Sequence, residues 1–142
     1  HLFAEGKTKN LWICMITYLL AIVSLSVCIK IKMFLLKPSE IFYTQDSINN
    51  VFTGRHMHSG KYIGTTLDEL ADGRTTVDQI SRISVKDING KWFTSDNRRL
   101  WVFKNFELLG GCTYIPVIQT TYIDPRKFTT YNGGKSVIVR RN

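Results

Sequence analysis

The stretch "ISRISVKDINGKWFTS", residues 80–95, decides the fold class of this chain. Its two halves, near 82–88 and 91–95, are rich in β-branched and aromatic residues, which is typical of strands. Asn89-Gly90 stands between them and tolerates the positive φ angles of a tight hairpin turn. The sequence therefore predicts an antiparallel hairpin here.

A helix follows the hairpin, over about Arg98 to Leu109. Gly110-Gly111 directly after it suits a C-terminal cap. Apolar residues occupy most of its circumference, which predicts a largely buried helix. These residues are Leu100, Trp101, Val102, Phe103, Phe106, Leu108 and Leu109.

Upstream of the hairpin, "SEIFYT" (39–44) has the composition of a short strand, and we expect "QDSINNVF" (45–52) to be a helix or turn. Thr66 and Glu69 have the spacing of a capping box, with Gly73 as a stop, which predicts a short helix over about 67–72. "TTVDQI" (75–80) is expected to add a helical turn.

Downstream, "TYIPVIQTTYI" (113–123) favours a strand, with Pro116 indicating an edge position or a bulge. Asn132-Gly133-Gly134 predicts a last hairpin near the end of the sequence. The expected fold class is therefore α/β (α+β), with a small mixed sheet and short helices over residues 37–142.

An apolar run without a charge, Leu11 to Ile29, lies within the preceding segment 1–36. Its length is close to the ~20 residues that a membrane-spanning helix needs. The flanking lysines weakly place the following domain in the cytoplasm by the positive-inside rule. They are Lys7, Lys9, Lys30, Lys32 and Lys37.

Other interpretations of this run stay open. A signal peptide is less favoured, because the run is long and no small-residue cleavage site follows it. Residues 1–32 are alternatively a stretch that the working protein does not contain, since Met33 stands just before the globular part. The expected location is then cytoplasmic or nuclear rather than a single-pass membrane protein.

The charge and the cysteines narrow the function classes. The 142 residues carry a formal net charge of +8, which favours polyanionic partners. Cys14, Cys28 and Cys112 form neither a disulfide framework nor a zinc-ligand spacing, a pattern typical of a reducing compartment.

The start of the predicted helix, Asp96-Asn97-Arg98-Arg99, is the candidate site. The Asp96 carboxylate can cap the first-turn amides. Two arginines at the positive end of a helix dipole are unfavourable by roughly 0.3–1 kcal/mol each, which indicates a bound anion such as phosphate. In the alternative, Arg99 pairs with an acid such as Asp68 or Asp96 while Arg98 is solvated; spacing alone favours this alternative, and both stay open.

The ordered series of motifs resembles the ParB/sulfiredoxin-like superfamily, over about Pro38 to Arg140. That family has a short helix, a strand hairpin, a G-E-R-R or G-x-H-R motif opening a helix, and a terminal I-P-V strand. Here the motif matches Asp96 to Arg99 and the strand matches Ile115-Pro116-Val117. The chain looks most similar to short animal ParB-like proteins that carry "DNRRLWVF".

The resemblance implies that Arg98 and Arg99 contact nucleotide phosphates. Asn97 replaces the acid of the ParB motif and Asp96 replaces its glycine. Sulfiredoxins place their reactive cysteine at the position of Asn97, so peroxiredoxin repair is not expected. Too few residues follow Ile118 for the helix-turn-helix of ParB proteins, so chromosome partitioning is not expected either.

Three more residues are candidate accessories to the site: Lys104, His56 and His58. Two histidines spaced i,i+2 with no further ligand nearby are more typical of an exposed loop than of a metal pair, so we expect no metal site. Aromatic residues alternate with basic ones around 91–104, a pattern that single-strand binders use, although core packing explains it better. Nucleic acid is thus a weak candidate partner.

Two functions from different classes remain. The first is a module that binds a nucleotide, with or without Mg²⁺, or another phosphate ligand. The second is a phosphohydrolase or nuclease, for which no catalytic residue is assigned. Metal-dependent hydrolysis needs clustered carboxylates, and the acids here are scattered, which favours the binding module. The chief ones are Asp46, Asp68, Glu69 and Asp96. A domain that binds no ligand is a third interpretation.

Overall fold

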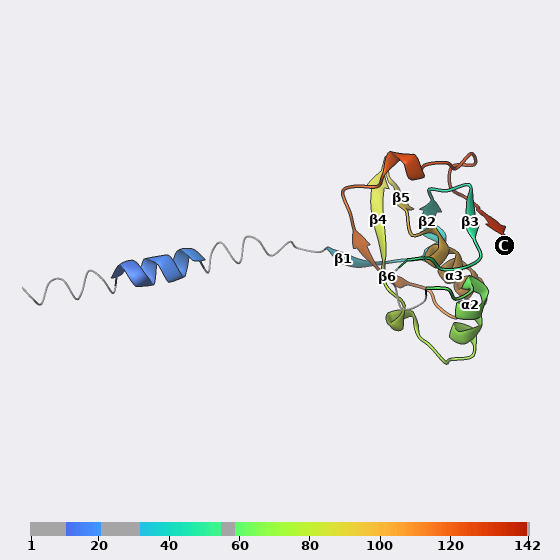
Figure 1. The fold of residues 1–142 in the computed structure, drawn as a ribbon, viewed down its shortest axis with the longest axis horizontal. Coiled ribbons are helices and arrows are strands. Elements are labelled where there is room, and N and C mark those ends of the chain that lie inside the picture. The colour runs from blue at the N-terminus through green and yellow to red at the C-terminus, as the bar shows by residue number, and fades with distance from the viewer. Residues whose placement is uncertain (1–10, 21–31, 55–58, 142) are drawn as a thin grey trace, which may run out of the picture. The chain divides into compact units, whose positions relative to one another are not determined.

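The computed structural model describes residues 11–20, 32–54 and 59–141. The chain forms two compact units, and the second begins at Lys32 (Figure 1). In the first unit, residues 11–20 are helical and their side chains are exposed. No helix in the described ranges is long and apolar enough to cross a membrane. Residues 21–29 lie outside those ranges, so a single helix over 11–29 stays a prediction.

The second unit confirms the predicted fold class, a mixed α/β domain. Its main sheet has five strands in the order β1-β6-β4-β5-β2, with both parallel and antiparallel pairs. The strands are β1 (Met33–Leu36), β2 (Ile41–Tyr43), β4 (Ile83–Ile88), β5 (Lys91–Thr94) and β6 (Ile115–Gln119). The helices of this unit are α2 (Ile63–Ala71) and α3 (Asn97–Leu108), with 3-10 turns η1 (Pro38–Glu40), η2 (Val77–Gln79) and η3 (Pro125–Lys127).

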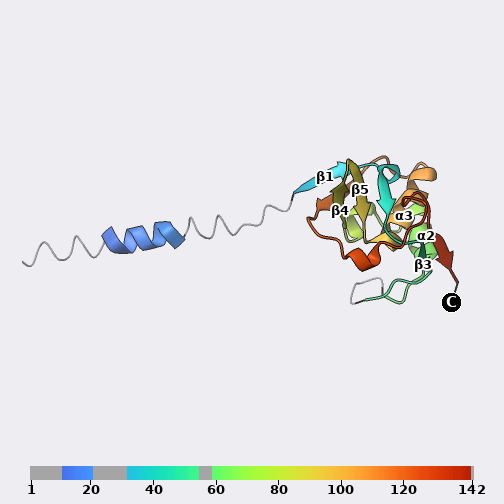
Figure 2. The same ribbon diagram turned by 90° about the horizontal axis from the view of Figure 1, so that it is seen from above.

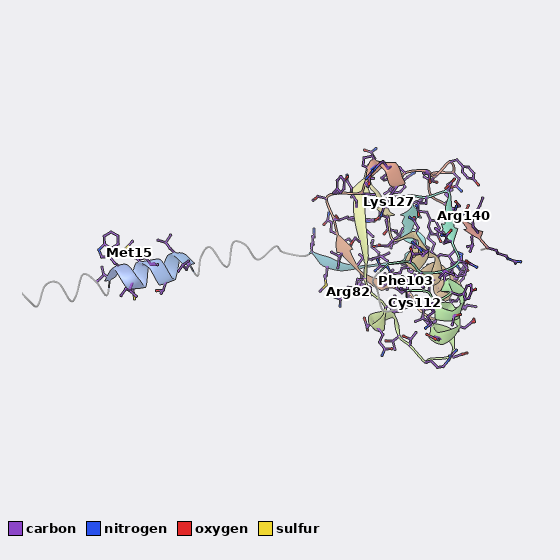
Figure 3. All side chains as sticks on the ribbon, viewed as in Figure 1. Met15, Arg82, Phe103, Cys112, Lys127 and Arg140 are labelled. Atoms are coloured by element: carbon purple, nitrogen blue, oxygen red, sulfur yellow. The ribbon has the colours of Figure 1, made fainter. Side chains whose placement is uncertain are left out.

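The core brings these elements together. Ile83 and Val85 of β4 are fully buried with Leu100 and Phe103 of α3, and Figure 3 shows Phe103 inside the domain. These two β4 residues alternate along the strand and so share one sheet face, while the two α3 residues are spaced i,i+3 and share one helix face. Burial of this face positions the start of α3 against the sheet.

The predicted hairpin is confirmed. Strands β4 and β5 pair antiparallel, and the turn residues Asn89 and Gly90 have φ angles of 53° and 81°. The helical turn predicted within 75–80 is also present, as η2. Both elements could be predicted from the local sequence, because each turn is formed by residues that are neighbours in the chain.

Strand β1 was not predicted, and the domain boundary lies earlier than residue 37. Because β1 pairs with β6, the strand that contains Pro116 is interior and the predicted edge position is wrong. Pairing between β4 and β6 begins only at Ile83, opposite Val117. Pro116 precedes that ladder, so its missing N–H breaks no bond within it.

A second, two-stranded sheet corrects two further expectations. Residues 47–49 form strand β3 (Ser47–Asn49) rather than a helix or turn, and it pairs in parallel with β7 (Ile138–Arg140). Strands β3 and β1 lie on opposite sides of the domain in both views (Figures 1 and 2). Because the partner strand is distant in sequence, no local pattern predicts this pairing.

The glycine turn near the end of the sequence does not close a hairpin. Gly134 has a φ angle of 77°, and its carbonyl accepts a hydrogen bond from Tyr43 N at 2.9 Å. A Cβ at Gly134 would lie 2.2 Å from the Tyr43 carbonyl oxygen. The turn is therefore docked on β2, and only glycine permits that approach.

Helix α2 begins at Ile63, earlier than the predicted start, and Thr66 does not cap it. Thr66 is fully buried within the helix, and Glu69 forms an ion pair with Lys61. The predicted stop is confirmed, since Gly73 has a φ angle of 73° just after the helix. Burial of one helix face, rather than the capping signal, sets where α2 begins.

Helix α3 ends as predicted, with Gly110 at a φ angle of 76°. Its last turn is not buried, however: Leu108 and Leu109 are 83% and 65% exposed, which contradicts the predicted burial. The buried stripe runs through Leu100 and Phe103, and the two leucines lie off that stripe.

Candidate functional site

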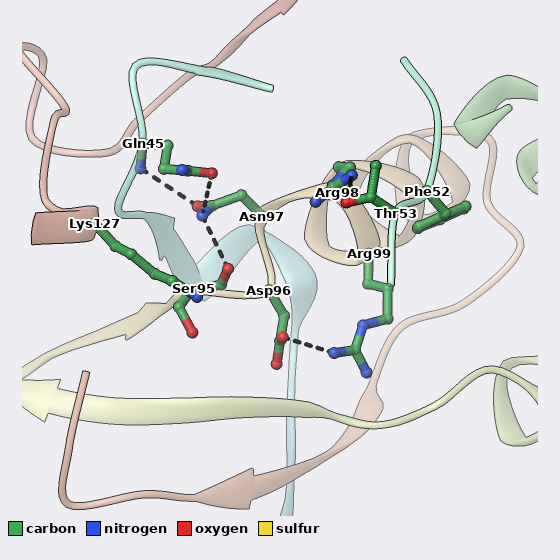
Figure 4. A pocket seen from close by; sticks show the side chains of 9 residues that line it. All are labelled: Gln45, Phe52, Thr53, Ser95, Asp96, Asn97, Arg98, Arg99 and Lys127. Carbon is green, nitrogen blue, oxygen red and sulfur yellow. Dashed lines mark hydrogen bonds and ion pairs between the residues drawn. The ribbon is translucent and has the colours of Figure 1, made fainter. Parts of the chain in front are cut away.

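A cavity of about 250 Å³ lies at the start of α3 (Figure 4). It is formed by the first turn of α3, the segments that follow β2 and β3, and turn η3. The lining residues are Gln45, Phe52, Thr53, Ser95, Asp96, Asn97, Arg98, Arg99 and Lys127. The four residues of the predicted motif are thus brought together at one cavity.

Asp96 occupies the N-cap position of α3 through its backbone, because its carbonyl accepts from Leu100 N at 3.0 Å. Its carboxylate does not cap the helix, which contradicts the prediction. Instead Oδ2 accepts from Ser84 N at 2.8 Å, and Oδ1 accepts from Arg99 Nη2 at 2.6 Å. The first-turn N–H groups of residues 97–99 consequently have no acceptor within the part of the chain that the structure describes.

Arg99 is bound into the fold. Besides its ion pair with Asp96, its Nη1 donates to the carbonyl oxygens of Ser81 at 2.9 Å and Arg82 at 2.7 Å. Those carbonyls lie just before β4, outside its pairing with β6, which begins at Ile83. This is the pairing with Asp96 that the alternative interpretation of the sequence named, and it joins α3 to the sheet.

Arg98 has a different environment. Its Nη1 donates to Val51 O and to Thr53 Oγ1, both at 2.8 Å. No carboxylate of the described residues lies within ion-pair distance of it. Burial, and then the neighbouring charge of Arg99, lower the pKa of the Arg98 guanidinium. An arginine has five N–H donors, so three remain for a ligand, and the alternative in which Arg98 is simply solvated does not describe it.

Asn97 is buried, with 2% of the residue's surface exposed, and its side chain is bonded within the fold. Its Oδ1 accepts from Thr44 N at 2.9 Å, and its Nδ2 donates to Thr44 Oγ1, Gln45 Oε1 and Ser95 O. The side chain of Asn97 is therefore occupied by the fold, and only its backbone N–H can make the predicted contact with a ligand.

Lys127 is a lining residue that sequence reasoning missed. Turn η3 is capped by the Asp124 side chain, which accepts from Arg126 N at 3.0 Å. The backbone N–H groups of Thr129 and Thr130 both donate to the Thr44 carbonyl, and these two bonds hold the segment beside Gln45. The sequence shows only two basic residues after Pro125, and this local pattern does not predict which surface of the domain they approach.

Of the predicted accessory residues, the structure describes only Lys104. Lys104 Nζ lies 5.0 Å from the centroid of the Tyr43 ring and does not line the cavity, so this prediction is wrong in position. Burial lowers the pKa of Lys104. His56 and His58 lie outside the described residues. Among the described residues, no three histidine, cysteine or acidic side chains are grouped to hold a metal ion.

Comparison with known proteins adds no assignment, since neither a protein-family model nor a curated protein matches the chain.

Proposed function

We propose that this domain is a small binding module that takes a phosphate group, of a nucleotide or another ligand, at the start of α3. The observation that carries the proposal is the environment of Arg98. Its guanidinium is part-buried at a cavity and has no acidic partner among the described residues. A charge in that position is stabilised by a bound anion.

The surroundings of Arg98 suit a phosphate group in particular. The N–H groups at the start of a twelve-residue helix are directed at the same region, and the helix dipole favours an anion there. Lys127 adds a second cation from η3. Together these groups supply several donors to the several acceptor oxygens that phosphate carries.

The same geometry favours binding over catalysis. Asp96 contributes the one carboxylate among the described lining residues, and both of its oxygens already accept hydrogen bonds, from Arg99 and from Ser84 N. A phosphohydrolase or nuclease needs a free base or a carboxylate that holds a metal ion. The observed lining therefore supports the binding module as the leading proposal.

We also propose membership of the ParB/sulfiredoxin-like superfamily. The order of elements supports it: α2, the β4–β5 hairpin, and helix α3 opening at Asp96, followed by the Ile115-Pro116-Val117 strand. Phosphate binding at Arg98 fits the position that this resemblance implies.

The test is a thermal-shift screen of the full chain against nucleotides and inorganic phosphate, with and without Mg²⁺. A ligand of the folded state raises the melting temperature, by an amount that grows with its concentration over Kd. Arg98→Gln should remove the shift, while Arg126→Gln, a matched charge change at a residue that does not line the cavity, should retain it. No shift with any ligand, or equal shifts in both variants, would count against the proposal.

For the first unit, we propose that residues 11–29 anchor the chain in a single-pass arrangement, with the domain on the cytoplasmic side. The exposure of the large apolar side chains within 11–20 supports this proposal. The test is co-flotation of the full chain with liposomes. Ile16→Lys combined with Leu20→Lys should abolish flotation, and unchanged flotation would contradict an apolar anchor.

A further inference from the structure

The charges of the residues that line the cavity bear on which class of phosphate ligand it holds. Four lining residues are charged: Asp96, Arg98, Arg99 and Lys127. The Asp96 carboxylate is paired with Arg99, so these two charges offset one another within the fold. Neither Arg98 nor Lys127 forms an ion pair with a carboxylate of the described residues, although the hydrogen bonds from Arg126, and then the charge of Lys127, lower the pKa of the Asp124 carboxyl on the same turn. The cavity is thus left with two positive charges facing whatever it holds.

These two charges come from different parts of the chain. Arg98 stands on the first turn of α3 and is fixed through Val51 O and Thr53 Oγ1. Lys127 reaches the cavity from η3, and Figure 4 shows the two residues on different sides of Asn97. Because both residues line one cavity of about 250 Å³, a small group held in it lies near both cations.

The size of the cavity limits the ligand. Its volume of about 250 Å³ is below the ~300–1,000 Å³ typical of pockets that enclose drug-sized molecules. A single phosphoryl group fits within such a volume, and the remainder of a ligand has to leave through the mouth. A phosphate with two ester substituents needs two exits, and a terminal phosphate needs one.

We infer that the cavity selects a doubly charged terminal phosphate, a small phosphomonoester, over a singly charged phosphodiester. This inference rests on the proposed function and names its ligand class. A phosphomonoester carries about −1.5 to −2 charge at pH 7, which matches the two free cations. A phosphodiester carries a single negative charge and leaves one cation uncompensated. The backbone of nucleic acid, which is a phosphodiester, is therefore disfavoured at this site.

The first test compares two pairs of probes on the full chain by calorimetry, at pH 8 and constant ionic strength. Sulfate against methyl sulfate compares two charges with one, and both anions are fully ionised at this pH, so the charge of each probe is fixed. Phenyl phosphate against methyl phenyl phosphate makes the same comparison for phosphate. We expect the dianion of each pair to bind ~10-fold more tightly, since one extra charge then lies beside two cations.

The second test assigns this preference to Lys127. Lys127→Gln should reduce the preference for the dianion to ~3-fold or less, and Lys135→Gln, the same change at an exposed lysine that does not line the cavity, should leave it unchanged. The Lys127 side chain is exposed and forms no hydrogen bond or ion pair within the described residues, although its charge, after the hydrogen bonds from Arg126, helps to lower the pKa of the nearby Asp124 carboxyl, so the fold should be retained. An equal loss of preference in both variants would show a general charge effect and overturn the inference.

The outcomes separate this inference from the proposed function. If both members of each pair bind equally and Arg98→Gln abolishes both, the cavity binds phosphate without selecting its charge, and the inference fails alone. If no probe binds the unmodified chain, both the inference and the proposed function fail.

Discussion

Arg98 and Arg99 are neighbours in sequence, yet they lie in opposite kinds of environment. Arg99 pairs with Asp96 and donates to the carbonyls of Ser81 and Arg82, so its charge belongs to the fold. Arg98 donates to two neutral oxygens and has no carboxylate partner in the described ranges. We call these the anchored side and the open side of the cavity.

The difference between the two sides follows from helix geometry. Successive residues on a helix point about 100° apart, so adjacent arginines meet different neighbours. Arg99 meets the carbonyls of Ser81 and Arg82, which lie before the β4–β6 ladder begins at Ile83. Arg98 meets the segment after β3, which presents Val51 O and Thr53 Oγ1 and no acid. A pair of like charges in a motif can therefore divide into one structural and one ligand-binding residue.

The largest effect on stability is expected at Asn97, whose side chain, like that of Arg99, is bonded within the fold. Asn97→Ala leaves the buried Thr44 N–H without its acceptor and removes the donor to the Thr44 hydroxyl, which keeps its own bond to Thr94 O, and should lower the free energy of unfolding by ~3 kcal/mol. Urea unfolding measures it. Asn105→Ala is the matched control on the same helix, with a loss below ~1 kcal/mol because that side chain bonds one carbonyl within its own helix. Equal losses in the two variants would show that the contacts of Asn97 do not anchor the helix.

Arg99→Ala should lower the free energy of unfolding by ~2 kcal/mol, because it removes the donor to Asp96 Oδ1 and to the carbonyls of Ser81 and Arg82. The side chains of Arg99 and Asp96 are 19% and 22% exposed, so solvent weakens the pair only in part. Asp96→Ala combined with Arg99→Ala should cost less than the sum of the two single changes. Strict additivity in the urea midpoints would mean that the pair is not coupled.

Arg98→Ala should lower the free energy of unfolding by less than ~1 kcal/mol, since water can replace its bonds to part-exposed neutral oxygens. A loss as large as that of Arg99→Ala, measured under the same conditions, would remove the distinction between the two sides.

Lys104→Gln should change phosphate affinity by less than about twofold, because a cation outside the cavity contributes only a screened charge. Calorimetric titration with inorganic phosphate measures it. A loss of affinity comparable to that of Arg98→Gln would extend the open side along α3 and contradict the cavity described above.

Much of the fold and the place of the site could be predicted from local sequence. The Asn89-Gly90 turn and the Gly110 cap depend on neighbouring residues, and so does the position of Asp96 at the start of α3. Strand β1 and the β3–β7 pairing could not, because their partners are distant in the chain and their strands are short.

The roles within the site were harder to predict than its position. The sequence pattern treats Arg98 and Arg99 alike, and what separates them is the tertiary contact each one finds. The Asp96 carboxylate bonds to Ser84 N and Arg99 instead of capping the helix. Lys127 reaches the cavity only because its segment is held on Thr44.

The most direct test of the account is a side-chain and backbone NMR titration of the ¹⁵N-labelled full chain with inorganic phosphate. We expect the Arg98 Nε–H and the backbone N–H signals of residues 97–99 to shift with a common saturation curve, while the Arg99 Nε–H signal moves little. Movement of Arg99 with no change at Arg98, or no saturable change at either, would contradict the assignment of Arg98 to a phosphate ligand and of Arg99 to the fold.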